Sequence, residues 1–486
     1  MPNADLTTPT RRLQWKGLYC ETELCKAAIR VYTKPVFQWR KALRSSTDGK
    51  TFYEFAARGL QRLDAIHRSL AREQFHYRPS VALRYNFNGK HRTLYIPPWE
   101  ERIVDLLLYR VLNRRLDRWF SANSYAYRRR GYGLDFCQSR IARTLRSYQD
   151  PLYIVKRDIS DYFASVDHRV LLGQLRSLVD PGDYLYRLLR ERVEFSYLER
   201  ERLETAAQGI PFGTAIACLL ANVYLTGLDR EVESVSGLHY FRYADDLLLI
   251  SADRQRATEA AGRLEGLVAS LGLKLKASHR ADFMLARERF ADPRFLGVSD
   301  FRHLGLLFRS GGGVALSRDK LRKIQNLFRF AFRRKRHQWK RERDPAARAQ
   351  VLVNVATETV DGAVRNVAIL DYYLKHVNDE NQLRLLDRWL AEEVLSKVFG
   401  GHRKGHFRRI SFYSLRAMGL PSLLHRRRMI ARGLVDAPFF VWQGGKAARA
   451  LRGTVARLCR SNGEAAFSSF PEAAATKTPV REGGCL

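Results

Sequence analysis

Apolar positions follow a helical spacing in some parts of the chain and a strand-like pattern in others. Residues 19–80 have helical spacing with a break at 45–49, and a further helix is predicted from Trp99 to about Phe120. Residues 83–97 alternate between apolar and polar around Asn88-Gly89, a dipeptide that favours a two-residue hairpin turn. The first quarter of the chain is therefore predicted to be helical with one hairpin.

Three apolar strands are predicted in the middle of the chain, and each of them lies next to acidic residues. Leu152–Val155 leads into a polar bend that contains Asp158, and two further strands, 238–243 and 247–251, flank Asp245 and Asp246. Charged groups at the ends of buried strands are costly unless they are paired or bind a metal. If these carboxylates meet, they repel one another and demand cations. An Asp-rich turn without a functional role is the alternative.

The rest of the chain is predicted to be mostly helical. Helices are expected at about 168–179, 213–230 and 253–271, and a hairpin at 304–316 around Gly311-Gly-Gly313. Ser317 is a predicted N-cap, after which the pattern is helical to about residue 399. We expect five regions: a helical N-terminal extension at 1–84, a mixed α+β segment at 85–317, a helical segment at 318–400, a basic helical region at 401–445 and a flexible tail at 446–486.

The charge of the chain indicates a polyanionic partner. It has 85 Lys and Arg against 50 Asp and Glu, a net charge of +35. Binding of nucleic acid would relieve this self-repulsion and would depend steeply on salt. A ribosome-associated or merely basic soluble protein is the alternative. The six cysteines lack zinc-ligand spacing, and the longest apolar run, 215–225, is too short to cross a bilayer. These patterns predict a cytoplasmic protein with reduced thiols and no membrane contact.

The three acids suggest a specific chemistry. Two divalent ions held by carboxylates are a known solution for in-line displacement at phosphorus, and Mg²⁺ prefers oxygen ligands. We expect Asp158 and Asp245 to bridge two Mg²⁺ ions, for which Mn²⁺ can substitute. Asp246 would support the ion that activates a 3′-hydroxyl, and the Ile159 carbonyl would add an oxygen ligand.

The tetrad Tyr243-Ala-Asp-Asp246 resembles the signature of reverse transcriptases, and neighbouring blocks resemble that family in the right order. The resemblance covers about residues 85–320. It implies an α+β right-hand polymerase with fingers and an antiparallel palm sheet at 85–317 and a helical thumb at 318–400. It also implies an RNA-directed DNA polymerase that adds dNTPs to a 3′ end. The blocks are Arg92–Pro97 with Arg102, Ser124–Arg128, Asp158–His168, Gln208–Gly213 with Leu220–Leu225, Leu271–Leu275 and His303–Gly305.

The resemblance also implies roles for single residues. Phe163, five residues after Asp158, would lie under the sugar and exclude a ribose 2′-hydroxyl; a Phe of the hydrophobic core is the alternative. Relatives usually have a lysine after the Leu271–Leu275 block; here His279 is the candidate proton donor, or an ordinary surface histidine. The remaining candidates are Gln208 and Gly209 for the nucleotide, Arg92, Arg102 and Arg128 for its triphosphate, and Leu304 and Gly305 for a primer grip.

The predicted thumb has one apolar and one cationic face. In a palm polymerase the helix after the primer grip follows the product duplex, so its cations are candidates for backbone contacts. A solvated charged surface is the alternative. The candidate residues are Arg333, Arg334, Lys335, Arg336, Lys340 and Arg341.

The resemblance extends to a branch of the family and to partners. The chain resembles group II intron-like and unclassified, defence-associated bacterial enzymes. The block that begins at Gln208 continues as Gly213-Thr-Ala-Ile-Ala and lacks the Ser-Pro typical of intron enzymes, so it resembles diversity-generating and unclassified bacterial groups more closely. The expected partners are dNTPs, a DNA product and an RNA template, in particular a dedicated non-coding RNA. A diversity-generating reverse transcriptase and an RNA-binding maturase or scaffold are alternatives. The sequence leaves open whether a second copy or an accessory protein takes part.

Overall fold

The computed structural model describes residues 12–33, 46–87, 90–128, 132–149, 151–277, 281–287, 292–361 and 369–435. The predicted Asn88-Gly89 turn, His279 and the predicted tail at 446–486 lie outside these residues. Within them, the N-terminal extension is helical as predicted, with α1 (Glu21–Thr33), α3 (Phe52–Ala57) and α4 (Gly59–Ala71). Both α1 and α4 pack against α5 (Trp99–Arg115).

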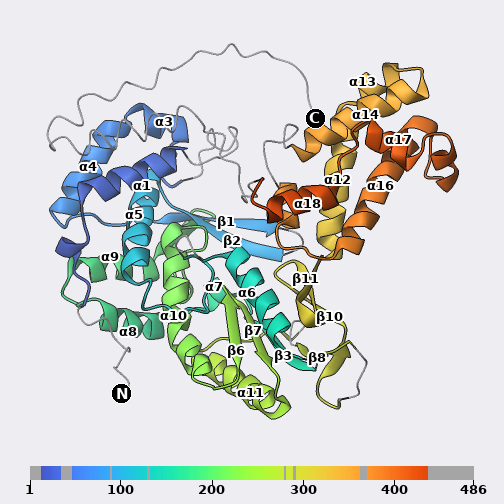
Figure 1. The fold of residues 1–486 in the computed structure, drawn as a ribbon. Coiled ribbons are helices and arrows are strands. Elements are labelled where there is room, and N and C mark those ends of the chain that lie inside the picture. The colour runs from blue at the N-terminus through green and yellow to red at the C-terminus, as the bar shows by residue number, and fades with distance from the viewer. Residues whose placement is uncertain are drawn as a thin grey trace.

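The central sheet has five strands in the order β6-β7-β3-β8-β9, and only the β8–β9 pair is parallel. Helices α8 (His168–Leu178), α10 (Ala215–Glu233) and α11 (Arg254–Ser270) belong to its helical layer (Figure 1). Both faces of β3 and β7 are buried, which explains why these strands are apolar without alternation. The strands are β3 (Leu152–Asp158), β6 (His239–Tyr243), β7 (Asp246–Ser251), β8 (Ala281–Leu285) and β9 (Leu296–Val298).

A second sheet, in the order β2-β1-β4-β5, contains the predicted hairpin. Strands β1 (Ser80–Phe87) and β2 (Lys90–Ile96) pair antiparallel, which confirms that prediction. The sequence pattern did not indicate β4 (Ser196–Glu199) and β5 (Arg202–Thr205), which follow α9 (Tyr184–Val193). Their short, charged sequence gives no clear strand signal.

A third sheet joins the palm to the thumb. It consists of β10 (Asp300–His303), β11 (Leu306–Arg309) and β12 (Gly313–Leu316), all antiparallel. Ser317 then precedes α12 (Arg318–Arg334) as predicted, but its hydroxyl donates to the Gly305 carbonyl and to Asp319 instead of capping the helix.

The region predicted to be helical up to residue 399 consists of separate helices. After α12 come α13 (Arg336–Arg341), α14 (Pro345–Val360), α15 (Ile369–Leu374) and α16 (Glu380–Phe399). The basic region that follows contains the short 3₁₀ helix η4 (Lys404–Arg408), α17 (Phe412–Ala417) and α18 (Leu423–Ala431). These elements pack on α14, α15 and α16, so residues up to 431 share the thumb's core.

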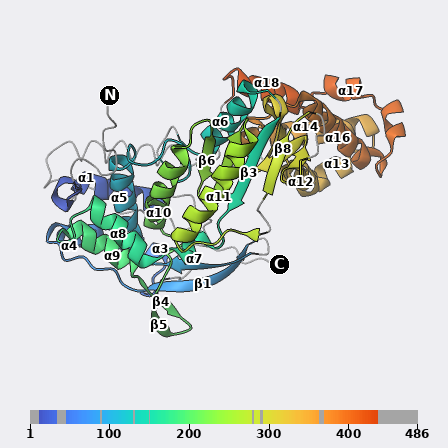
Figure 2. The same ribbon diagram turned by 90° about the horizontal axis from the view of Figure 1, so that it is seen from below.

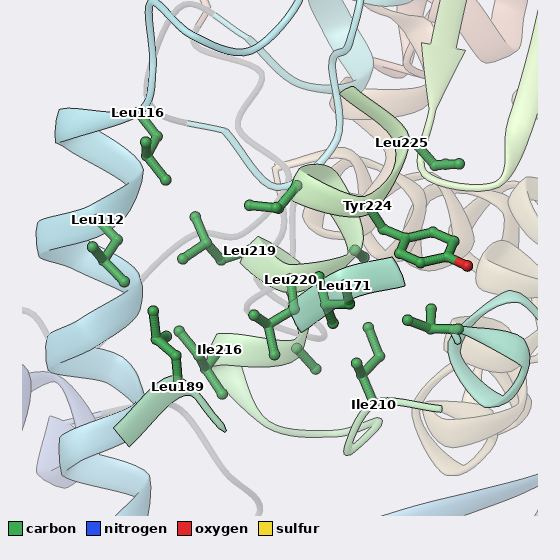
Figure 3. Close-up of a cluster of buried hydrophobic side chains, with 14 of the residues drawn as sticks. Leu112, Leu116, Leu171, Leu189, Ile210, Ile216, Leu219, Leu220, Tyr224 and Leu225 are labelled. Carbon is green, nitrogen blue, oxygen red and sulfur yellow. The ribbon is translucent and has the colours of Figure 1, made fainter. Parts of the chain in front are cut away.

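The described residues form two large hydrophobic cores, one on each face of the central sheet. The first joins the N-terminal helices to α5, α8, α9, α10 and α11; Figure 3 shows leucines of α5 facing those of α10. The second joins the opposite face of the sheet to α6 (Leu134–Ser147), the third sheet and the thumb. Figure 2 shows the N-terminal helices and the thumb at opposite ends, with the central sheet between them. Each fully buried leucine contributes roughly 1.5–3 kcal/mol.

Candidate active site

The three predicted acids lie at one edge of the central sheet. Asp158 ends β3 and is paired in register with Asp246, the first residue of β7. Asp245 occupies the tight turn between β6 and β7, where Ala244 has a φ of 58°. The Ile159 amide donates to the Asp245 carbonyl at 3.2 Å. The fold therefore brings together side chains 87 residues apart in the sequence.

Burial and neighbouring negative charge make Asp245 and Asp246 harder to ionise. Burial is the main cause that raises the pKa of Asp245, and the Asp158 carboxylate adds to it. Burial, then Asp245 and Asp158, raise the pKa of Asp246 to about 6. Such a cluster favours any cation that can reach it.

Lys276 provides one such cation. Its ammonium donates to Asp158 Oδ1 at 2.6 Å and lies 3.9 Å from Asp245 Oδ2. Its backbone amide also donates to the Asp158 carbonyl at 2.8 Å. The sequence pattern predicted His279 as the proton donor and did not indicate Lys276, which directly follows Leu275. The bridge that pairs Leu275 with Ile159 brings Lys276 to the acids.

A buried arginine supports the turn that carries Asp245. The Arg242 guanidinium is fully buried and binds both carboxylate oxygens of Asp229 at 2.7 Å. It also donates to Asn222 Oδ1 at 3.1 Å and to the Ala244 carbonyl at 3.3 Å. Asn222 in turn donates to the Ala126 carbonyl at 2.9 Å. The network thus connects the acidic turn to α10 and to the Ser124–Arg128 loop, and sequence reasoning missed it.

Phe163 lies on the short helix α7 (Tyr162–Ser165), beside the Gln208-Gly209 segment. The Phe163 carbonyl accepts from the Ile210 amide at 2.8 Å. Gly209 has a φ of 84°, and a Cβ there would lie 3.0 Å from the Phe163 carbonyl oxygen, so close packing requires glycine. The half-buried Phe163 ring contacts Tyr127 and Phe212 edge-on, and Gln208 is exposed.

The three predicted triphosphate ligands differ in their surroundings. Arg92 is exposed on β2 and is near enough to Asp245 to counteract the rise in the pKa of that acid. Arg102 donates to the Pro97 carbonyl and stacks on Trp99, and burial lowers the pKa of its guanidinium to about 10. The Arg128 side chain is buried against Asp117 and Tyr132. A triphosphate contact would require Arg128 to give up these bonds, whereas Arg92 is accessible.

The predicted primer grip forms the turn between β10 and β11. Leu304 and Gly305 both have left-handed backbone conformations, with φ values of 47° and 81°. Gln138 donates to the Leu304 carbonyl at 3.0 Å, and Ser317 donates to the Gly305 carbonyl at 2.7 Å. These bonds fix the turn between α6 and the start of the thumb.

The predicted thumb cations lie on α12 and α13, with Lys335 between the two helices. The apolar side of α12 is buried in the second core, including Ile324, Phe328 and Phe332. Five of the six predicted cations are exposed and Lys335 is partly buried. The amphipathic division predicted from the sequence is thus present.

The described residues contain no preformed cluster of three or more His, Cys, Asp or Glu side chains that could hold a metal ion. The donor set at the acidic turn is nevertheless of the type that suits hard divalent cations, since it consists of carboxylate oxygens. Lys276 shows that a cation fits against Asp158 and Asp245. Among the helices of the described residues, none is long and apolar enough to span a bilayer.

A mostly antiparallel sheet with acids paired at the ends of β3 and β7, followed by a helical segment after residue 317, has the architecture of a right-hand polymerase. Comparison with known families specifies this class further. Residues 84–306 match the family described as "Reverse transcriptase (RNA-dependent DNA polymerase)". This part of the chain is similar to that family, and its architecture is α+β as predicted.

Curated relatives are distant. They include an uncharacterized 91 kDa protein in the cob intron of Schizosaccharomyces pombe, 26% identical and covering 36% of this chain and 21% of that protein. Protein YkfC of Escherichia coli is 25% identical over 44% of this chain and 67% of that protein. The group II intron-encoded protein LtrA of Lactococcus lactis is 26% identical over 29% of this chain and 23% of that protein. The chain spans less than a quarter of the two intron proteins.

Among solved structures, similarity is found to telomerase from Candida albicans in complex with a fragment of telomeric RNA. The TM-score is 0.42 at 10% identity, covering 75% of this chain and 69% of that chain. Apo telomerase from Candida tropicalis gives a TM-score of 0.41 at 9% identity, covering 78% of this chain and 66% of that chain.

Proposed function

We propose that this protein is an RNA-directed DNA polymerase that adds dNTPs to a 3′ end. The observation that carries the proposal is the register pairing of Asp158 with Asp246, with Asp245 in the adjoining turn. The similarity of residues 84–306 to the reverse transcriptase family supports it. Extension of a DNA primer on a mixed-sequence RNA template, with a DNA template of the same sequence for comparison, tests it. Products on the RNA template are expected, and extension on DNA alone would contradict the proposal.

Asp158, Asp245 and Asp246 would hold two Mg²⁺ ions, with the Ile159 carbonyl as an added ligand and Mn²⁺ as a substitute. Bound there, such ions acidify a 3′-hydroxyl and offset the charge of the leaving pyrophosphate. The protein's own contribution is to support the turn that carries Asp245, through the bond from Arg242 to the Ala244 carbonyl, and to raise the pKa of Asp245 and Asp246 by burial. Lys276 holds Asp158 in place and is positioned to donate a proton to the leaving group.

The nucleotide would lie between β2 and α7. Arg92 is the accessible cation on the β2 side, and its guanidinium suits a triphosphate. Gly209 allows the backbone to approach closely, with Gln208 exposed beside it. The Phe163 ring would face the sugar, and the exposed cations of α12 and α13 would contact the backbone of the duplex.

Phe163→Ala is expected to weaken the discrimination between dNTPs and rNTPs. Removing the ring leaves room for a 2′-hydroxyl, and the ratio of kcat/KM values for dNTP over rNTP should fall by about 10–100-fold. Single-nucleotide incorporation with each substrate measures this ratio. Phe212→Ala, which removes a ring that packs on Phe163, is the matched control and should change the ratio less. An unchanged ratio in Phe163→Ala would assign that ring to the core alone.

Lys276→Met is expected to make the protein more responsive to divalent cations. The lysine and a metal ion compete for the Asp158 carboxylate, so its loss should tighten Mn²⁺ binding by roughly tenfold, about 1.5 kcal/mol. The shift in Tm caused by Mn²⁺ should be larger than in the wild type, while incorporation slows. Lys274→Met, two residues earlier, is the control. An unchanged Mn²⁺ affinity would show that the lysine and the ion do not share a site.

We further propose that the enzyme is a bacterial, stand-alone anti-phage protein that works with a dedicated non-coding RNA. The resemblance of the chain to unclassified, defence-associated bacterial enzymes supports this role, whereas the Gln208–Gly213 block favours a diversity-generating enzyme. The expected result is protection of host cells against phage that is lost in the Asp245→Ala, Asp246→Ala double variant. Retained protection would favour a maturase or scaffold. A template and variable repeat pair beside the gene would favour a diversity-generating enzyme.

A further inference from the structure

The far end of the thumb presents exposed aromatic rings within a strongly basic segment. Residues 394–435 contain ten Lys and Arg and no Asp or Glu. Within this segment the Tyr413 side chain is 83% exposed and that of Phe412 is 40% exposed. Figures 1 and 2 both place α17, which carries these rings, at the end of the thumb remote from β6 and β7.

Three cations that shortly precede these rings in the sequence are free of ion pairs within the described part of the chain. Arg403, Lys404 and Arg408 are exposed and form no ion pair with any residue that the structure describes. By contrast, Arg426 binds both carboxylate oxygens of Asp371 at 2.9 Å, and Arg428 pairs with Glu380. Arg426 and Arg428 of α18 thus form ion pairs within the fold. Arg403 and the η4 residues Lys404 and Arg408 remain available to bind a partner.

The backbone that carries these side chains is firmly anchored. The His406 ring stacks on Phe399 and lies 3.2 Å from the Gly401 carbonyl oxygen, and Ile410 and Leu415 are buried in the second core. Ser411 caps α17 by accepting from the Ser414 amide at 2.9 Å. The rings are therefore exposed on a fixed support, where they can bind a partner at a low entropic cost.

We propose that Arg403, Lys404, Arg408, Phe412 and Tyr413, here called the η4–α17 surface, bind an RNA strand with unpaired bases. Phosphates would contact the three cations, and an unpaired base would stack on Tyr413. A fully paired duplex offers phosphates but no free base. This function goes beyond polymerisation: the surface would hold a template RNA at a loop or bulge while the primer terminus occupies the palm.

The test measures RNA binding, which requires no catalysis and can succeed or fail independently of polymerase activity. The probe is a fluorescein-labelled RNA hairpin with an eight-nucleotide loop, compared with a blunt RNA duplex of equal length. Tyr413→Ala should weaken hairpin binding about five- to twentyfold and duplex binding by less than twofold, while Tyr413→Trp restores it. Tyr53→Ala, which removes an exposed ring of α3, is the matched control.

A triple variant, Arg403→Gln with Lys404→Gln and Arg408→Gln, tests the phosphate contacts. Its plot of log Kd against log salt concentration should be shallower by about two, since each lost contact with single-stranded RNA removes roughly 0.7. Both variants should extend a short primer on a short unstructured RNA template at the wild-type rate. Equal losses of hairpin and duplex binding in Tyr413→Ala, or an unchanged salt slope, would overturn the proposal.

Discussion

Asp245→Asn should reduce dNTP incorporation on an RNA template by on the order of 10³-fold or more, equivalent to about 4 kcal/mol of transition-state stabilisation. The substitution keeps the size of the side chain but removes the charge that would hold a cation against the 3′-hydroxyl. Because burial and Asp158 already oppose ionisation of Asp245, the folded protein should tolerate the neutral amide well. Single-turnover incorporation, with Tm measured in parallel, separates activity from stability.

The matched control is Asp161→Asn, which removes an exposed acid three residues after Asp158. It should leave the incorporation rate within about twofold of the wild type, as expected for a solvated surface charge. Asp245→Asn activity within tenfold of the wild type would contradict the role given to the acidic turn.

Arg242→Met is expected to destabilise the protein by about 3–5 kcal/mol, because it leaves Asp229 buried without its cation. It should also slow incorporation in the fraction that remains folded, since the Ala244 carbonyl loses the donor that supports the turn beside Asp245. Urea unfolding measures the stability, and kcat measured well below the melting temperature measures the effect on the turn.

Arg192→Met separates these two effects. Arg192 is also fully buried and pairs with Asp105 at 2.6 Å, but Arg192 lies on α9 and Asp105 on α5, away from the acidic turn. The Arg192→Met variant should lose a similar amount of unfolding free energy, and its kcat should be nearly unchanged. If both variants lower kcat equally, Arg242 acts on the fold alone and not on the position of Asp245.

The sequence could predict those parts of the site that local pattern determines. The strands before Asp158 and around Asp245 are apolar on both faces because a helical layer and a second core cover them, and that pattern is visible without coordinates. The right-hand polymerase arrangement followed from the order of the blocks. Predicting that Asp158 and Asp246 lie together required two sources. The apolar pattern predicted the strands, and the resemblance to the family predicted that these strands are neighbours.

The support of the site depends on pairings between distant segments that no local pattern reveals. Lys276 reaches Asp158 because Leu275 forms a bridge with Ile159 across more than a hundred residues. The choice of Asp229 as the partner of Arg242 depends on how α10 packs against β6. Strands β4 and β5 exist because they extend the β1 sheet, which overrides their weak local preference.

The most direct test of the central claim is template-directed addition of a single nucleotide. The purified chain is mixed with a primer annealed to an RNA template, Mg²⁺ and one dNTP at a time, and the product length is read on a gel. Addition should occur only with the dNTP complementary to the next template base, and should disappear when Asp158 is replaced by Asn. Failure to add any nucleotide with Mg²⁺ or Mn²⁺, or addition that survives Asp158→Asn, would contradict the claim that the three acids form a polymerase centre.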